Sequence, residues 1–285
     1  MGAGGAPEGM VENPYCPWRG RCHRAPIGEW ACRSQVAQSD EVPMLDALAP
    51  NGAPVFVALA DTPASKALHY RLRYQVYCQK LAYEDPTRFP DGEERDQYDE
   101  HAVHFLAYDG RRGDWVGALR LVPPEPVGLP LTFLTGLAAS VVHLVKQRRV
   151  AEISRMCVAS SPAPGAGQPT ASLDCGVSAM IFFALVRASV AYAFRHGFDH
   201  LAFLTTLSLS RLLGRVGITD QAAGDGCEYR GRRFPRIADV AQLYRNLIEA
   251  ADKHPFSARL GPEPFVLFSA LSARPEIAEP LAACG

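Results

Sequence analysis

Three polar residues interrupt an otherwise apolar, strand-like run at residues 150–158, which reads Val-Ala-Glu-Ile-Ser-Arg-Met-Cys-Val. A carboxylate or guanidinium that is buried without a partner costs several kcal/mol of folding free energy. Glu152 and Arg155 must therefore either form a structural ion pair or line a functional cleft. Strict alternation along a strand sends Glu152 and Ser154 to one face of the sheet and Arg155 to the other. We expect a β-bulge or a splayed strand here, or a separate partner for Arg155.

Two further arginines lie in apolar surroundings. Arg120 interrupts the apolar run 117–122, and Arg73 lies beside the apolar stripe of a predicted helix. An arginine that extends its head to solvent is the alternative for Arg73. Because a guanidinium donates paired hydrogen bonds to a carboxylate, Arg73, Arg120 and Arg155 are all candidates to bind the carboxylate of a small molecule.

An acidic, turn-rich segment at residues 84–100 reads EDPTRFPDGEERDQYDE. A loop of this length is commonly functional, and a solvated acidic loop is the alternative. Its Asp96 and Asp99 are candidates either to bind the ammonium group of a substrate or to hold the arginines, Arg155 above all.

The composition is that of an ordinary globular protein. The chain has 285 residues, 48% of them hydrophobic, and a formal net charge of -1. This charge balance gives no electrostatic case for nucleic acid binding. Eight cysteines are scattered along the chain, and the first thirty residues lack the apolar core of a signal peptide. We therefore predict a protein of the reducing cytoplasm.

A possible zinc site is formed by Cys16, Cys22 and Cys32, together with His23. The spacing of these residues is not that of the tight cysteine pairs in structural zinc sites, so we predict no metal.

The most apolar run, residues 177–194, is only just long enough to span a bilayer and is interrupted by Arg187. We expect it to be a buried core helix, and peripheral membrane contact stays open.

Apolar periodicity predicts alternating strands and helices in an order that fits a mixed sheet with helices on both faces. Asp61 or Thr62 caps the first helix, and Pro63 takes its first position. The predicted strands are 55–59, 103–108, 115–122, 150–158, 198–205, 216–221 and 227–230, and the predicted helices are 63–81, 136–147, 175–196, 207–215 and 237–251.

The chain divides by composition into three parts. Residues 1–50 are rich in Gly, Pro and Ala and read as a disordered or loosely attached leader. Residues 51–255 form the folded domain. Residues 256–285 form a C-terminal extension that packs on this domain or trails from it.

Four short motifs follow one another along the chain: Arg73-x-x-Val76-Tyr77, Glu94-x-Asp96-x-Tyr98-Asp99, Gly117-x-x-Arg120-Leu121 and Glu152-x-Ser154-Arg155. In this order they resemble the acyl-homoserine-lactone (autoinducer) synthases and the long-chain N-acyl amino acid synthases. The match is closest to the PEP-CTERM/exosortase system-associated acyltransferases. That match adds Phe89-Pro90-Asp91-Gly92, Val103-His104-Phe105-Leu106 and Glu228-Tyr229-x-Gly231-Arg232-Arg233-x-Pro235.

The resemblance covers about residues 55–250 and implies an acyltransferase domain at 51–255. It implies an α/β (α+β) fold like that of the Gcn5-related N-acetyltransferases. This fold has a mixed, mostly antiparallel central sheet with helices on both faces, and the sheet is splayed near the 150–158 strand to admit a pantetheine arm. The implied reaction moves an acyl group from a thioester, acyl carrier protein or acyl-CoA, to an amine, with no permanently bound cofactor.

Two departures from the family narrow the substrates. The tryptophan that lines the S-adenosylmethionine pocket of autoinducer synthases is replaced here by Leu81-Ala82-Tyr83, which disfavours that acceptor. The glycine-rich loop that cradles the coenzyme A diphosphate is absent, because segment 160–174 has few glycines and several prolines without N–H groups. A carrier-protein thioester has no diphosphate, so we favour it as the donor.

Acyl transfer to an amine requires a base for the amine proton and donors for the oxyanion. An α-amino group has a pKa of about 7.7–8.0, so a modest base suffices. By resemblance this base is Glu152, acting directly or through a water molecule. Cys157 as a nucleophile is the alternative, disfavoured because no histidine lies near it in sequence and a buried thiol is normally inert.

We therefore predict a cytoplasmic N-acyltransferase that joins a fatty acyl group to the amine of an amino acid or a related metabolite. The alternatives are an autoinducer synthase and a non-catalytic acyl- or lipid-binding module. An acidic acyl carrier protein would dock on basic residues at 146–149 or 230–236. The predicted catalytic residues are Glu152, Ser154 and Arg155, and the predicted substrate-binding residues are Arg73, Tyr77, Tyr83, Asp96, Asp99 and Arg120.

Overall fold

The computed structural model of the protein describes residues 55–110, 112–159, 175–249, 260 and 264–269. These residues belong to one compact unit of the chain. The predicted leader, the segment 160–174 and most of the predicted C-terminal extension lie outside the described residues. The division of the chain into three parts therefore stays a prediction.

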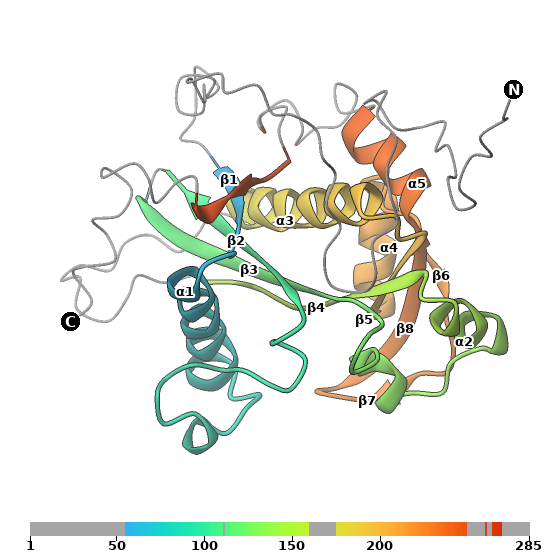
Figure 1. Ribbon diagram of the computed structural model, residues 1–285, viewed down its shortest axis with the longest axis horizontal. Helices are drawn as coiled ribbons and strands as arrows, with labels where there is room; N and C mark the ends of the chain where they lie inside the picture. Colours follow the sequence, from blue (N-terminus) through green and yellow to red (C-terminus); the bar gives the residue numbers. More distant parts are fainter. Residues whose placement is uncertain (1–54, 111, 160–174, 250–259, 261–263, 270–285) are drawn as a thin grey trace, which may run out of the picture. The chain divides into compact units, whose positions relative to one another are not determined.

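A mixed sheet runs through the described part of the chain (Figure 1). Its strands follow the order β6-β8-β5-β4-β3-β2-β1-β9, and β7 pairs with β8 beside this path. β5 runs parallel to β4 and β9 runs parallel to β1, whereas the other described pairs are antiparallel. With helices on both faces, this architecture confirms the predicted fold class. The strands are β1 (Val55–Leu59), β2 (Val103–Asp109), β3 (Asp114–Val122), β4 (Val150–Val158), β5 (His200–Thr205), β6 (Gln221–Ala222), β7 (Cys227–Glu228), β8 (Arg232–Asp239) and β9 (Val266–Leu267).

Helix α1 (Pro63–Tyr74) begins where the sequence predicts. The Thr62 hydroxyl accepts a hydrogen bond from the Ser65 N–H, and the Ser65 hydroxyl accepts one from the Thr62 N–H in return. The helix continues as a π-helix over Gln75–Lys80, close to the predicted end. Such wide turns are rare and commonly occur at functional sites. This one lies beside the candidate site.

Helices α1 and α3 (Cys175–Arg195) cover opposite faces of the sheet, because neighbouring residues of β2 contact different helices. The ring centroids of His104 and His69 of α1 are 4.7 Å apart, whereas those of Phe105 and Tyr192 of α3 are 5.8 Å apart. In the described part of the chain, α3 is the one helix long and apolar enough to cross a membrane by length and composition. Within the most apolar 18-residue stretch of α3, 72% is buried inside the molecule. It is therefore a core helix, as predicted.

Strand β3 approaches α3 closely at Gly117. A Cβ atom at this position would lie 2.7 Å from Cγ2 of Ile181 and 3.0 Å from Cβ of Ala107. Both separations are shorter than ordinary carbon contacts, so glycine sets the distance between α3 and the sheet here.

The C-terminal part of the domain differs from the prediction in two places. The predicted strand 216–221 is mostly a turn, in which Gly217 takes a φ of +80°, and strand structure begins at β6. The predicted helix 237–251 starts with a strand, because β8 extends to Asp239 and helix α5 (Val240–Tyr244) follows it. The arginines and Pro235 of β8 obscured the strand pattern in the sequence, since proline is uncommon within sheets. The other described helical segments are 3-10 turns at Pro86–Arg88 and Pro130–Phe133, α2 (Ala139–Lys146), α4 (Leu207–Arg215) and a π-helix at Arg245–Glu249.

Candidate active site

The central strand β4 is irregular where its polar residues lie. Ala118 of β3 pairs with Cys157, whereas Arg120 pairs with Ser154, so β4 accommodates one extra residue. Arg155 takes a left-handed φ of +49° in this bulge. Ser154 and Arg155 consequently both reach charged groups on the α1 face of the sheet. The predicted bulge is confirmed.

Strands β4 and β5 separate where the bulge begins. They pair only between the positions of Val150 with His200 and Ile153 with Phe203. Residues 154–158 and 203–206 then line the same cavity. Backbone N–H groups that a longer β5 ladder would have satisfied are therefore available to a ligand. The expected splay of the sheet is present.

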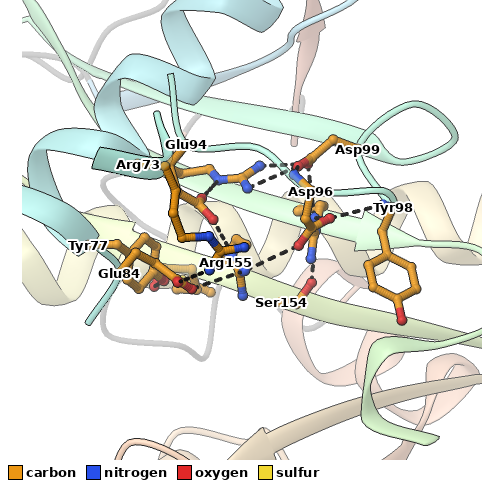
Figure 2. A network of polar contacts seen from close by, with 12 residues as sticks. Arg73, Tyr77, Glu84, Glu94, Asp96, Tyr98, Asp99, Ser154 and Arg155 are labelled. Carbon is orange, nitrogen blue, oxygen red and sulfur yellow. Dashed lines mark hydrogen bonds and ion pairs between the residues drawn. The ribbon is translucent and has the colours of Figure 1, made fainter. Parts of the chain in front are cut away.

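A buried network of charges connects α1 with the sheet (Figure 2). Nε of Arg73 lies 2.5 Å from Oε2 of Glu94, and its two Nη atoms lie 2.6 and 3.0 Å from the carboxylate of Asp99. Burial alone would lower the pKa of Arg73, but the two carboxylates outweigh it and raise the pKa above its ordinary value. The solvent-extended alternative for Arg73 is wrong, because the residue is fully buried.

Asp99 lies at the centre of this network. It accepts a hydrogen bond from the Asp96 N–H at 2.7 Å, and Oδ1 lies 3.0 Å from Nη1 of Arg120 and 3.1 Å from Nε2 of His104. Burial alone would raise the pKa of Asp99, but the His104 hydrogen bond and the guanidinium of Arg73 hold it well below its usual range. Asp99 is thus a permanent negative charge that organises its neighbours.

Arg120 and Arg155 link the network to the bulge. Arg120 donates from Nη1 to Oδ1 of Asp96 at 2.6 Å and from Nε to Oγ of Ser154 at 3.1 Å. Arg155 donates from Nε to Oε1 of Glu94 at 3.1 Å and from Nη2 to Oδ2 of Asp96 at 3.2 Å. Arg155 therefore pairs with two carboxylates of the acidic segment, as the sequence predicts.

Glu152 has a different environment. Its Oε2 accepts a hydrogen bond from the Leu131 N–H at 2.8 Å, and the residue forms no ion pair with the described residues. Burial raises the pKa of Glu152 to about 8, outweighing the opposite effects of the Leu131 N–H and Arg120. A carboxylate with this pKa takes up a proton readily near neutral pH, as a general base for an amine must.

A mainly apolar cavity of about 630 Å³ opens beside the bulge. Its polar lining includes Glu152, Ser154 and Arg155. The size and the lining suit a small molecule with a long apolar part. Its apolar wall includes Phe182, Val186 and Val190 of α3, Leu201 of β5, Leu213 of α4 and Leu243 of α5.

A second cavity, of about 430 Å³, is polar and adjoins the first. Glu84, Glu94, Arg88 and Arg95 contribute to its lining. A small charged molecule in the polar cavity would lie next to one end of a molecule in the apolar cavity. The two cavities share the lining residues Tyr83, Asp96, Arg155, Tyr229 and Arg230, which we call the junction.

Tyr83 and Arg230 of the junction stack together with the neighbouring Tyr77. The guanidinium of Arg230 lies 5.5 Å from the ring centroid of Tyr77 and 5.3 Å from that of Tyr83, and it forms an ion pair with Glu84. The Tyr77 hydroxyl donates a hydrogen bond to the Met156 carbonyl at 2.8 Å. Tyr77 thereby ties the π-helix that follows α1 to the bulge.

Cys157 has the environment of an inert thiol. It is buried, and burial raises its pKa to about 12. The thiolate is therefore scarce at neutral pH, which favours direct transfer over an acyl-enzyme. Among the described residues, no group of three or more His, Cys, Asp or Glu side chains is arranged to hold a metal ion. The grouping at Cys16–Cys32 lies outside the described residues.

The structure brings the nine predicted site residues into one region. Arg73 and Asp99 line neither cavity and support the others from behind. Glu84 and Arg230 were not predicted as site residues, because they are 146 positions apart and no local pattern joins them. The seven predicted residues that line a cavity are Tyr77, Tyr83, Asp96, Arg120, Glu152, Ser154 and Arg155.

Comparison with known proteins agrees with this geometry. Residues 72–162, which include Arg73, the acidic segment and strands β2 to β4, match the family described as Acetyltransferase (GNAT) domain. This segment is therefore similar to a GNAT-type acetyltransferase domain. This match supports the prediction of an acyltransferase enzyme.

Relatives of this domain point the same way. An acyl-homoserine-lactone synthase of Rhizobium radiobacter is 30% identical over 155 residues, which are 53% of this chain and 66% of that protein. The structure of TofI in a ternary complex with an inhibitor and MTA is 25% identical, with a TM-score of 0.50, and the match covers 73% of this chain and 98% of that chain. The structure of a CoA-dependent acyl-homoserine lactone synthase, BjaI, with MTA shares the fold at 17% identity and a TM-score of 0.50, over 82% of this chain and 100% of that chain. Homology to acyl-homoserine-lactone synthases is thus confirmed.

Proposed function

We propose that the protein is an N-acyltransferase that moves a long-chain fatty acyl group from an acyl-carrier-protein thioester to the amine of an amino acid or a related metabolite. The observation that carries this proposal is the meeting of an apolar cavity and a polar cavity at the bulge of β4. The acyl chain suits the first cavity and a charged acceptor suits the second. Their reacting atoms would then meet at the junction.

The thioester carbonyl would lie along residues 154–158, where β4 no longer pairs with β5. Backbone N–H groups in this stretch are suited to stabilise the oxyanion of the tetrahedral intermediate. We assign a carrier-protein donor because segment 160–174 is poor in the glycines that a diphosphate requires, and acyl-CoA is the alternative. The thioester is a substrate, so this scheme needs no permanently bound cofactor.

Glu152 would remove the amine proton, directly or through a water molecule. Its pKa of about 8 is close to the pKa of an α-amino group, about 7.7–8.0, so the transfer is nearly balanced. The amine nitrogen forms a bond to the thioester carbon, and collapse of the tetrahedral intermediate breaks the carbon–sulfur bond. The leaving thiolate then takes up a proton.

The charged residues would divide the recognition of the acceptor. Arg155 and Arg230 are the candidates for a carboxylate, which would share them with their present acidic partners, because both line the junction. Asp96 also lines the junction and is the candidate for an ammonium group. We assign to Arg73 and Asp99 the positioning of Arg120 and Asp96, since neither of the two lines a cavity.

An acyl-homoserine-lactone synthase is the second candidate, because the curated relative that is 30% identical bears this name. The acceptor would then be S-adenosylmethionine. Tyr83, at the junction in place of the family's tryptophan, favours an amino acid instead. A non-catalytic acyl- or lipid-binding module would keep the apolar cavity and lack turnover.

The deciding experiment presents the full chain with acyl carrier protein loaded with acyl groups of several lengths, and separately with acyl-CoA. Each donor is combined with an amino-acid mixture or with S-adenosylmethionine. Thiol release is followed, and products are identified by mass spectrometry. We expect N-acyl amino acids from the carrier-bound donor. Lactone products would select the second candidate, and no thiol release with any pair would refute an enzyme.

Three finer assignments rest on the sequence. The cytoplasmic location and the association with a PEP-CTERM/exosortase system are among them. The third is the docking of the carrier protein on basic residues at 146–149 or 230–236. Each segment keeps one basic residue that forms no ion pair with the described residues, Lys146 in the first and Arg233 in the second.

A further inference from the structure

The large apolar side chains that the described residues expose gather at one place. Four of the seven line the apolar cavity while being 36% to 72% exposed, so they stand at its mouth, and two more lie on α4 beside it. The seventh, Leu267, lies on β9 at the far edge of the sheet. Exposed apolar side chains grouped around the opening of a cavity indicate an interaction site. The six residues, which we call the rim, are Leu81, Tyr83, Phe133, Leu207, Leu209 and Leu212.

Helix α4 combines three rim leucines with positive charge. It reads Leu-Ser-Leu-Ser-Arg-Leu-Leu-Gly-Arg and contains no acidic residue. Arg211 and Arg215 are exposed and form no ion pair with the described residues. Leu213 is buried in the cavity wall and anchors the helix. A helix that carries leucines and arginines on different sides and has no acidic residue is typical of elements that lie in a membrane interface.

We propose that the rim docks on an anionic lipid surface, with its apolar side chains in the outer acyl layer and Arg211 and Arg215 at the headgroups. The proposal rests on the proposed function in one respect, since the acyl cavity would then open toward the bilayer. An N-acylated product could leave the enzyme without exposing its chain to water.

The apolar side chains decide between a lipid surface and an acidic carrier protein. Both partners would satisfy the arginines. Charge pairing alone gives no reason for a phenylalanine ring that is 72% exposed or for Leu212 at 54%. The buried helix α3 is not the membrane-contacting element, because its most apolar stretch lies mainly inside the molecule.

Vesicle co-sedimentation of the full chain, without donor or acceptor, tests the proposal. We expect binding to vesicles of phosphatidylcholine mixed with phosphatidylglycerol, and weaker binding to phosphatidylcholine alone or at high salt. The double variant Phe133→Ser, Leu212→Ser should bind at least about tenfold more weakly. Leu267→Ser is the matched control, because Leu267 is 49% exposed and remote from the rim, and it should bind like the wild type. Circular dichroism checks that both variants are folded.

Three results would overturn the proposal: no binding of the wild type to the mixed vesicles, equal binding of the double variant, or equal loss in Leu267→Ser. A double variant that loses binding to acyl carrier protein but keeps vesicle binding would assign the rim to the carrier instead. Because vesicle binding is measured without substrates, its failure is distinct from a failure of acyl transfer. If the protein binds vesicles through the rim but transfers no acyl group, the lipid-docking proposal is supported and the proposed acyltransferase function is refuted.

Discussion

Glu152 owes its proposed role to burial rather than to a charged partner. Its pKa of about 8 predicts that kcat/KM for acyl transfer rises with pH and levels off above about pH 8, because the base must be unprotonated. Glu152→Gln should lower kcat/KM by about 10²- to 10⁴-fold and remove this dependence on the carboxylate. A pH series of thiol-release rates measures both effects. An unchanged rate in the variant would exclude Glu152 as the base.

The same substitution separates a catalytic from a structural Glu152. A carboxyl pKa raised from 4.5 to about 8 means that the folded state holds a proton that the unfolded state has lost. The wild type should therefore lose stability as pH rises from about 4.5 to about 8. Glu152→Gln stays neutral and keeps an acceptor for the Leu131 N–H, so it should be the more stable protein above pH 8. Urea unfolding at several pH values tests this sign. If Glu152→Gln is less stable than the wild type at every pH, Glu152 has a structural role instead.

At the scale of elements, the contact between β3 and α3 depends on Gly117. Gly117→Ala places a Cβ atom against Ile181 and Ala107, neither of which can withdraw in a packed core. We expect a loss of about 1–3 kcal/mol in the free energy of unfolding, measured by urea denaturation. Gly214→Ala in α4 is the control, since no atom lies within 4 Å of its added Cβ. The control should be neutral or stabilise by up to about 1 kcal/mol. Equal effects of the two substitutions would contradict the packing argument.

At the scale of the whole molecule, the charge network joins α1, the acidic segment, β3 and β4. Asp99→Asn should lower the free energy of unfolding by about 3–5 kcal/mol, because it leaves Arg73 and Arg120 buried and undercompensated. Asp91→Asn is the control, since its ion pair with Arg95 is exposed and should contribute less than about 1 kcal/mol. Similar losses in both variants would show that burial does not decide the cost.

The contribution of Asp99 also has a defined pH dependence. Its pKa in the folded state lies below the ordinary value of 3.8, so its stabilisation is present above that value and is lost as pH falls below it. The difference in stability between the wild type and Asp99→Asn should therefore shrink in acid. Thermal unfolding between neutral pH and about pH 3 measures this. A difference that stayed constant would mean that the cost of Asp99→Asn does not come from the lost charge.

The fold class and most of the elements could be predicted from the sequence, and so could the residues that the structure brings together at the candidate site. Glu152, Ser154 and Arg155 stood out because polar residues in an apolar strand must be compensated, and that requirement is readable locally. Helix α1 was readable for the same reason, since Thr62 and Pro63 act on their immediate neighbours. Strand β8 was missed because its arginines and Pro235 hide a pattern that β5 stabilises from outside.

The tertiary structure alone decided how these residues cooperate. The left-handed bulge at Arg155 turns two consecutive side chains to one face, and strict alternation would have separated them. The ion pair of Glu84 with Arg230, and the meeting of the two cavities beside it, join segments far apart in the chain. A charged residue in an apolar segment of the sequence indicates that a buried charge needs a partner. Which partner it finds depends on packing between distant elements, and no local pattern records that choice.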